Sequence, residues 1–90
     1  MDNIEQLIRS GKATIVDVRT PAEFNGGHVK QSINIPLNEI PTRVEEFRKM
    51  NDLVLCCASG GRSAQASLFL KQHGIECADG GSWRDVNCYC

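Results

Sequence analysis

The chain has 90 residues, of which 41% are hydrophobic and 23% charged, and a formal net charge of −1, so we expect one domain with one core over residues 1–90. Charges of both signs are interspersed, which excludes the basic surface of a nucleic-acid-binding protein and the polybasic arm of a membrane-bound one. An acidic start and the lack of an apolar run near the roughly 18 residues of a membrane span predict a cytoplasmic location.

The first residues predict a short helix followed by a buried strand. Apolar residues at helical spacing begin at Ile4, and Gly11 suits the C-terminal cap. Asp2 and Glu5 are spaced as a variant of the capping box. Residues 13–18, which are mostly apolar and β-branched, are typical of a buried strand.

Residues 20–24 have three features of a helix start: threonine at the N-cap, proline at the first position and glutamate at the third. A pair of glycines follows and should end this helix. Residues 32–35 predict a brief strand that the next proline stops. An apolar 3-4-3 stripe over residues 37–47 then predicts one charged helix, in which Pro41 fits only the first turn.

The second half of the chain repeats the alternation. Residues 53–56 predict a third strand, residues 64–73 a helix with a broad apolar face, and residues 75–78 a last strand. Strands alternating with helices over so short a chain favour right-handed crossovers and a mostly parallel sheet covered on both faces. Ligands of such sheets bind beyond the carboxyl ends of the strands, which is where Cys57 falls.

The segment between the third strand and its helix carries the chemistry. It reads Cys57-Ala58-Ser59-Gly60-Gly61-Arg62-Ser63. The N–H groups of a tight turn and of a helix start form an anion site, which lowers a thiol pKa and populates the nucleophilic thiolate. Gly60 and Gly61 allow positive φ and close approach of the backbone to a ligand. Arg62 either holds an anionic donor or pairs with a carboxylate, and Ser63 is either the helix N-cap or a hydroxyl donor to the sulfur.

Three sequence boxes in this order resemble the rhodanese homology domain. They are residues 17–24 (DVRTPAEF), residues 27–36, from Gly-His-Val to Asn-Ile-Pro, and the loop 57–63; residues 80–83 (GGSW) are similar to a shortened end of the domain. The resemblance implies an α/β fold of three layers, with a central, mostly parallel five-stranded sheet and helices on both faces. It also implies sulfurtransferase chemistry, in which Cys57 alternates between thiol and persulfide.

The loop length favours sulfur transfer. Four residues separate Cys57 from Arg62, whereas tyrosine-phosphatase-like loops have five, and the smaller ring suits one persulfide sulfur better than a tetrahedral phosphate. We expect Cys57 and Arg62 to be catalytic, with the other loop residues binding substrate: Ala58, Ser59, Gly60, Gly61 and Ser63. The expected donor is a compound such as thiosulfate, and the acceptor is a thiol, cyanide or a sulfur-accepting protein. Neither a cofactor nor a metal is implied.

Two other classes of function remain open. One is a noncatalytic rhodanese-like module that binds a partner or senses redox state, although the presence of Cys57 with its arginine favours an enzyme. The other is a cysteine-dependent phosphatase or arsenate reductase that uses the same loop.

Several residues near the boxes are interpreted as structural. Arg19 is expected to pair with Glu23 near the end of the first strand. His28 is interpreted as a structural histidine rather than a general base, because thiolate chemistry in this loop needs no base. Trp83 is interpreted as a packing residue.

The five cysteines are an odd number and contain no C-x-x-C pair, which favours reduced thiols and gives only a weak zinc signal. Cys56 and Cys77 are interpreted as small core residues, and strand alternation should point Cys56 away from Cys57. Cys88 and Cys90 fall in a C-terminal tail that we expect to be mobile. They could be resolving thiols for a persulfide, form a tail disulfide, or have no role.

Overall fold

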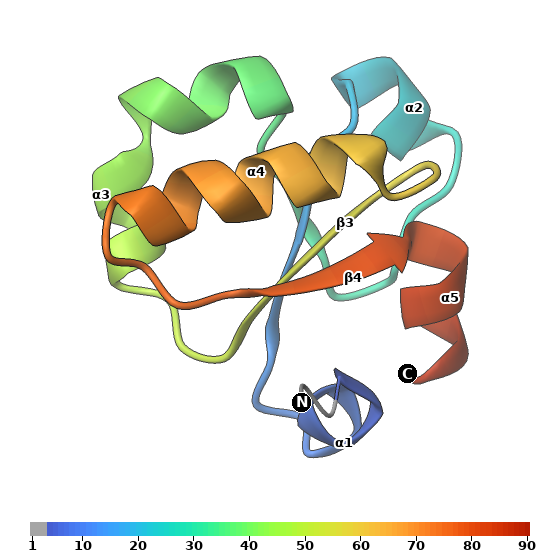
Figure 1. Ribbon diagram of the computed structural model, residues 1–90. Coiled ribbons are helices and arrows are strands. Elements are labelled where there is room, and N and C mark those ends of the chain that lie inside the picture. The colour runs from blue at the N-terminus through green and yellow to red at the C-terminus, as the bar shows by residue number, and fades with distance from the viewer. Residues whose placement is uncertain (1–3) are drawn as a thin grey trace.

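Four parallel strands form the centre of the protein, in a computed structural model that describes residues 4–90 (Figure 1). The strands are β1 (Thr14–Asp17), β2 (Ile33–Asn34), β3 (Leu53–Cys57) and β4 (Ala78–Ser82). They lie in the order β2-β1-β3-β4, and every neighbouring pair is parallel. The parallel sheet expected from the sequence is therefore confirmed, but the fifth strand is missing from the described residues. That strand came from the family resemblance alone, whereas the residue patterns predicted the four strands that are found.

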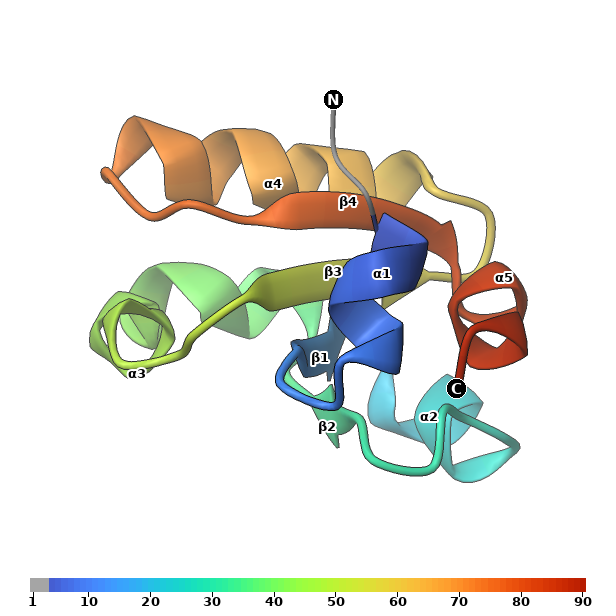
Figure 2. The same cartoon turned by 90° about the horizontal axis from the view of Figure 1, so that it is seen from below.

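Helices cover both faces of the sheet, which confirms the three layers (Figures 1 and 2). They are α1 (Ile4–Arg9), α2 (Pro21–Asn25), the 3₁₀ helix η1 (Leu37–Thr42), α3 (Val44–Arg48), α4 (Gly61–Gln72) and α5 (Trp83–Cys88). Asp2 of the expected first capping box lies outside the described residues.

The side chains of the strands alternate between two hydrophobic clusters, one on each face. Val16, Leu55 and Cys57 point to the cluster under η1, α3 and α4, where they pack with Phe47 and Leu70. Burying the Phe47 and Leu70 side chains stabilises the fold by about 2 kcal/mol each. Cys57 thus leaves β3 on the face that α4 covers.

The opposite face packs against α1 and α5. Ile15, Val54 and Cys56 of the strands contact Ile8 of α1 and Val86 of α5 in this second cluster. Because Cys56 and Cys57 are consecutive strand residues, their side chains lie on opposite faces, as the alternation predicted.

Helix α2 begins as the sequence predicts. The Thr20 hydroxyl accepts the Glu23 N–H at 3.2 Å, while the Glu23 carboxylate accepts the Thr20 N–H at 3.0 Å. Pro21 occupies the first helical position, where no N–H donor is lost. This reciprocal capping box fixes the Glu23 side chain at the carboxyl end of the sheet.

The single charged helix expected over residues 37–47 is wrong. The chain forms the 3₁₀ helix Leu37–Thr42, breaks at Arg43 with φ −122°, and then forms α3. Pro41 lies inside the 3₁₀ helix rather than in the first turn of an α-helix. Proline has no N–H to donate and clashes with the carbonyl four residues earlier, so one continuous helix is not compatible with this sequence.

The last strand is displaced from the expected residues 75–78 to Ala78–Ser82. Gly80 allows this pairing: a Cβ there would lie 2.9 Å from the Leu55 carbonyl oxygen and 2.7 Å from Val86 Cγ2. The register between β3 and β4 shifts between Leu55 and Cys57, opposite this close approach. Ile75 contributes to the core without joining the sheet.

The expected mobile tail is also wrong, because the chain forms α5 directly after β4. The Ser82 hydroxyl caps this helix by accepting the Arg84 N–H at 3.2 Å. Cys88 is therefore the last residue of a helix, and Cys90 follows it by two residues.

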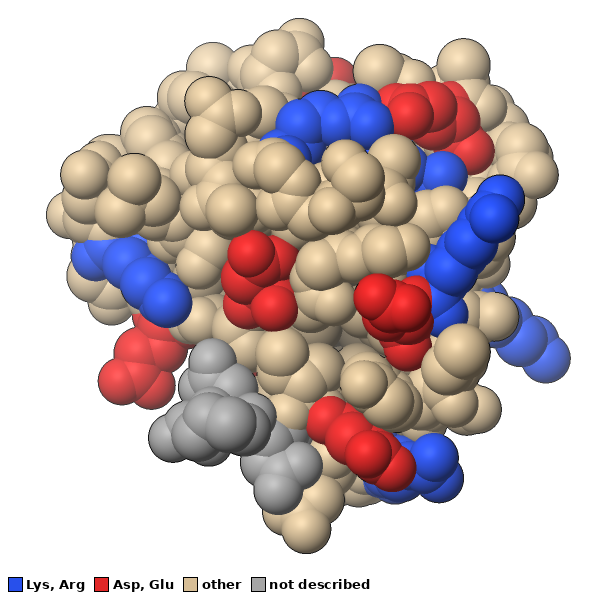
Figure 3. Space-filling view, turned by 45° about the vertical axis from the view of Figure 1, so that its right-hand side comes forward, with Lys and Arg blue, Asp and Glu red and all other residues tan. Residues whose placement is uncertain are grey.

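The surface of the described residues carries both signs of charge. In the face shown in Figure 3, acidic and basic side chains are interspersed rather than gathered into one field. No helix in residues 4–90 is long and apolar enough to cross a membrane.

Candidate active site

Cys57 ends β3 with its sulfur held by backbone donors. The N–H groups of Gly60 and Ser63 donate to its Sγ at 2.9 and 3.3 Å. Burial alone raises the pKa of this thiol, but the Ser63 hydroxyl and amide and the Gly60 amide outweigh burial, with a further contribution from the Ser59 amide. The pKa of Cys57 is therefore lowered, as expected for an amide cradle around a thiolate.

The two loop glycines have different roles. Gly60 has φ +104° and is the N-cap of α4, so it needs the left-handed conformation that glycine supplies. Gly61 has no positive φ and is the first residue of α4, and a Cβ there would meet nothing within 4 Å. Of the two loop glycines, only Gly60 uses the positive φ that the sequence analysis expected. Ala58 and Ser59 form the exposed outer part of the loop.

Ser63 lies in the first turn of α4 and is not its N-cap. Its Oγ is 3.5 Å from the Cys57 Sγ and 2.6 Å from the Asp79 Oδ1. A hydroxyl carries one hydrogen, so the Asp79 carboxylate competes with the sulfur for it. Asp79 is held in turn by the Gly81 N–H, which donates to the same oxygen at 3.0 Å.

Asp79 is a site residue that the sequence analysis missed. It falls one residue beyond the expected last strand, and only the displacement of β4 brings it beside Ser63. An acidic residue before a glycine pair at a strand end was the available signal.

Arg62 makes its ion pair with Glu23. Its Nη1 and Nη2 donate to the Glu23 Oε1 and Oε2 at 2.7 and 2.9 Å, in a bidentate arrangement. The Arg62 hydrogen bonds, followed by that of the Thr20 amide, lower the pKa of Glu23 to about 2, and the Glu23 carboxylate raises the pKa of Arg62. Both side chains are about one-third exposed. Arg62 thus pairs with a carboxylate, and its expected catalytic role stays a prediction.

Arg19 pairs with Asp17 and not with Glu23, so that expected pair is wrong. The Arg19 Nη2 donates to the Asp17 Oδ2 at 2.7 Å and to the Gly27 carbonyl oxygen at 2.7 Å. Its guanidinium lies 4.8 Å from the Trp83 ring centroid, in a cation–π contact. Both charged side chains are buried, and together they tie β1 to the segment after α2.

His28 makes local contacts. Its ring stacks on Phe24 at 3.7 Å between centroids, and its Nδ1 lies 2.7 Å from the Phe24 carbonyl oxygen. These contacts are consistent with the interpretation of His28 as a structural residue.

The five cysteines are free thiols. Cys56 is fully buried, and burial, followed by the charge of Asp17, raises the pKa of its thiol to about 12. Cys77 is only half-buried, at the edge of the first cluster, while Cys88 and Cys90 are exposed. In the described part of the chain, no three His, Cys, Asp or Glu side chains gather as metal ligands would.

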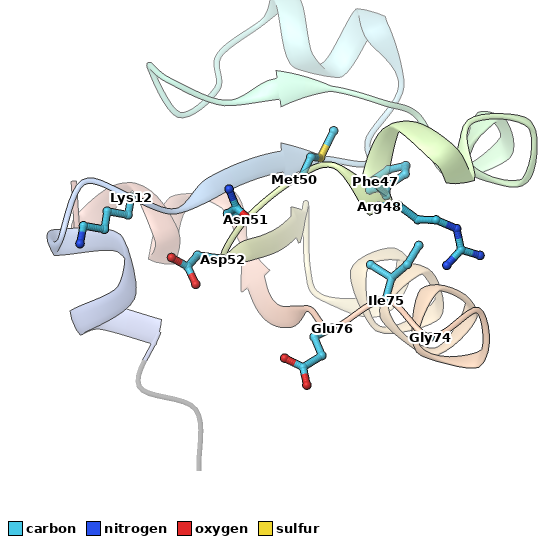
Figure 4. Close-up of a pocket in the computed structure, with 9 residues that line it drawn as sticks. All are labelled: Lys12, Phe47, Arg48, Met50, Asn51, Asp52, Gly74, Ile75 and Glu76. Atoms are coloured by element: carbon cyan, nitrogen blue, oxygen red, sulfur yellow. The ribbon is translucent and has the colours of Figure 1, made fainter.

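A surface cavity of about 960 Å³ lies at the other end of the sheet (Figure 4). Its lining comes from the segments that precede β1, β3 and β4 and from the end of α3, including Lys12, Asp52 and Glu76. Cys57 leaves the opposite end of β3, so this cavity is separate from the cysteine loop.

The comparisons with known proteins agree with this architecture. The family model named Rhodanese-like domain matches residues 1–82. A sulfurtransferase of Allochromatium vinosum is 39% identical over 70 residues, covering 78% of this chain and 65% of the relative, so the chain spans just under two thirds of that protein.

Solved structures give the same result. The rhodanese-related protein of Thermoplasma volcanium superposes with a TM-score of 0.77 at 32% identity, covering 90% of this chain and 81% of that chain. A structure titled rhodanese with anions from E. coli has a TM-score of 0.74 at 29% identity, covering 81% and 89%. Sequence boxes, parallel sheet, cysteine loop and comparisons all converge, and the chain belongs to the rhodanese-like domain family.

Proposed function

We propose that this protein is a sulfurtransferase that moves a sulfane sulfur through a persulfide on Cys57. The observation that carries the proposal is the Cys57 Sγ between the Gly60 and Ser63 amides, with the thiol pKa lowered. Family membership and the sulfurtransferase relative support sulfur transfer as the general activity.

The proposed reaction is a double displacement. The Cys57 thiolate attacks the outer sulfur of a donor such as thiosulfate, a new S–S bond forms, and the donor S–S bond breaks with its electron pair leaving on sulfite. A thiol, cyanide or a sulfur-accepting protein then attacks the outer sulfur, and Cys57 leaves as the thiolate. In both steps the loop N–H groups, from Ala58 to Ser63, stabilise the negative sulfur.

Anion binding by the loop is part of the proposal. The E. coli rhodanese whose fold is similar was solved with anions, according to its title. Gly60 and Ser63 provide N–H donors for a negative group at the sulfur here. Arg62 adds positive charge beside the loop, although Glu23 occupies both of its terminal nitrogens.

The alternative functions have less support. The four-residue spacing between Cys57 and Arg62 and the absence of an identified general acid weigh against a phosphatase. The lowered Cys57 pKa weighs against a noncatalytic module. A single domain over residues 1–90 and a cytoplasmic location stay predictions.

The decisive experiment is the mass of the intact, unreduced protein after incubation with thiosulfate. We expect a gain of one sulfur atom, removed by cyanide or excess thiol, and no gain in Cys57→Ser. Cys88→Ser is the matched control, because this thiol is exposed in α5 and should leave the gain intact. Aryl-phosphate hydrolysis without a sulfur adduct would instead favour a phosphatase.

A further inference from the structure

The Glu23 carboxylate is fixed between two parts of the site. Its Oε1 accepts hydrogen bonds from the Thr20 N–H at 3.0 Å and the Thr20 hydroxyl at 3.1 Å, which anchor it to the start of α2. On the other side, both carboxylate oxygens accept from Arg62 at the start of α4. Glu23 therefore holds Arg62 by a preorganised bidentate pair rather than by a mobile surface contact.

This pair changes what Arg62 offers a donor. A free guanidinium beside the loop would attract a dianion about twice as strongly, in free energy, as a monoanion at the same place. The Glu23 charge opposes that attraction, and it does so in proportion to the donor charge. Asp79, hydrogen-bonded to Ser63 next to the sulfur, adds a second negative charge at the loop, whereas Arg19 is already paired with Asp17.

We propose that Glu23 is a specificity-determining residue, which makes the site favour monoanionic sulfane donors over the thiosulfate dianion. The inference rests on the sulfur transfer proposed above. The backbone N–H donors at Gly60 and Ser63 remain for either donor, so Glu23 sets the preference by charge and leaves the reaction unchanged.

Methanethiosulfonate and thiosulfate form a matched pair of donors. Each carries a terminal sulfane sulfur on an oxidised sulfur, but the first has one negative charge and the second has two. The Cys57 thiolate attacks the terminal sulfur of either donor, the S–S bond breaks, and methanesulfinate or sulfite leaves with the electron pair. The persulfide formed is the same, and differences in leaving group cancel when the ratio of the two donors is compared between wild type and variant, so the change in that ratio reports the donor charge.

The test is kcat/KM for both donors, with cyanide as acceptor, in wild type and Glu23→Gln. Glutamine keeps one side-chain oxygen for the Thr20 N–H, removes the negative charge and retains at most one of the two hydrogen bonds from Arg62. We expect kcat/KM to rise roughly tenfold for thiosulfate and roughly threefold for methanethiosulfonate, as Coulomb attraction across a partly exposed site predicts. The ratio of thiosulfate to methanethiosulfonate kcat/KM should therefore rise about threefold.

Two further variants fix the interpretation. Glu46→Gln removes an exposed carboxylate that pairs with Arg43 beside α3, at the other end of α4 from α2 (Figure 1), and should leave the ratio unchanged. Arg62→Gln should shift the ratio the opposite way, toward methanethiosulfonate. The proposal would be overturned if Glu23→Gln left the ratio unaltered, or if it lowered kcat/KM for both donors by the same factor.

A second measurement needs no turnover. Sulfate and methanesulfonate, a dianion and a monoanion, should both protect Cys57 from iodoacetamide. Glu23→Gln should lower the protecting concentration of sulfate more than that of methanesulfonate, and equal changes would reject the role of Glu23. If neither donor forms a persulfide, the proposed function fails while this competition still decides the charge preference.

Discussion

Replacing Asp79 with asparagine should increase the acidity of the Cys57 thiol. In the native site the Ser63 hydroxyl lies 2.6 Å from the Asp79 carboxylate and 3.5 Å from the sulfur. Its hydrogen is held by the carboxylate in a charge-assisted hydrogen bond and is less available to a thiolate. Asparagine keeps the size of the side chain, removes the negative charge and weakens its claim on that hydrogen, and the last two effects favour the thiolate.

The magnitude follows from the same distances. Because Ser63 Oγ contacts both groups, the Asp79 Oδ1 and Cys57 Sγ are no more than about 6 Å apart. Two unit charges at this separation repel by about 1 to 3 kcal/mol, at effective dielectric constants of about 20 to 60. Since 1.4 kcal/mol is a factor of ten, even the lower value gives about fivefold more thiolate at a pH below the midpoint.

The assay is the rate of iodoacetamide alkylation at Cys57 against pH. We expect the midpoint of the profile to move to lower pH in Asp79→Asn, with a smaller plateau because a more acidic thiolate is a weaker nucleophile. Asp52→Asn, an equivalent change before β3 at the opposite end of the sheet, should leave the midpoint in place. A midpoint that rises in Asp79→Asn would show that the carboxylate positions Ser63 to stabilise the thiolate, and would refute the competition argument.

Three more predictions concern stability and selectivity. Gly60→Ala should destabilise the fold by about 1 to 3 kcal/mol because of its φ of +104°, whereas Gly61→Ala should be neutral or slightly stabilising in urea unfolding. The pKa of Glu23 is lowered to about 2 in the folded protein. Pairing with Arg62 therefore stabilises the protein fully above the unfolded pKa of Glu23, near 4.5, and less as the pH falls toward 2. Glu23→Gln should flatten the free energy of unfolding against pH over this range. Burial raises the Cys56 pKa to about 12, and peptide mapping after alkylation near pH 8 should find this thiol unmodified.

Local signals in the sequence predicted the parts of the fold that local chemistry decides. The capping box of Thr20 and Glu23 formed as expected, and the alternation along β3 separated Cys56 from Cys57. The cysteine loop followed its strand and opened a helix, as its glycine and arginine indicated.

Features that depend on tertiary contacts were not visible in the sequence. Asp79 and Gly80 are poor strand formers, yet β4 includes them because only a glycine fits against the Leu55 carbonyl oxygen. Glu23, the partner of Arg62, lies 39 residues away on another helix. The spacing of the charges could not show whether Glu23 would pair with Arg62 or with Arg19. Pairing choices of this kind are made by the packed fold.

The placement of Cys56 and Cys57 on opposite faces of β3 affects how long a persulfide could survive. The neighbouring thiol in the chain is an obvious intramolecular scavenger, able to take the outer sulfur or form a disulfide. Here the sheet itself stands between the two sulfurs, and Cys56 is fully buried with its proton firmly held. Under the proposed function, a sulfur carried by Cys57 would thereby be shielded from the cysteine next to it in the chain.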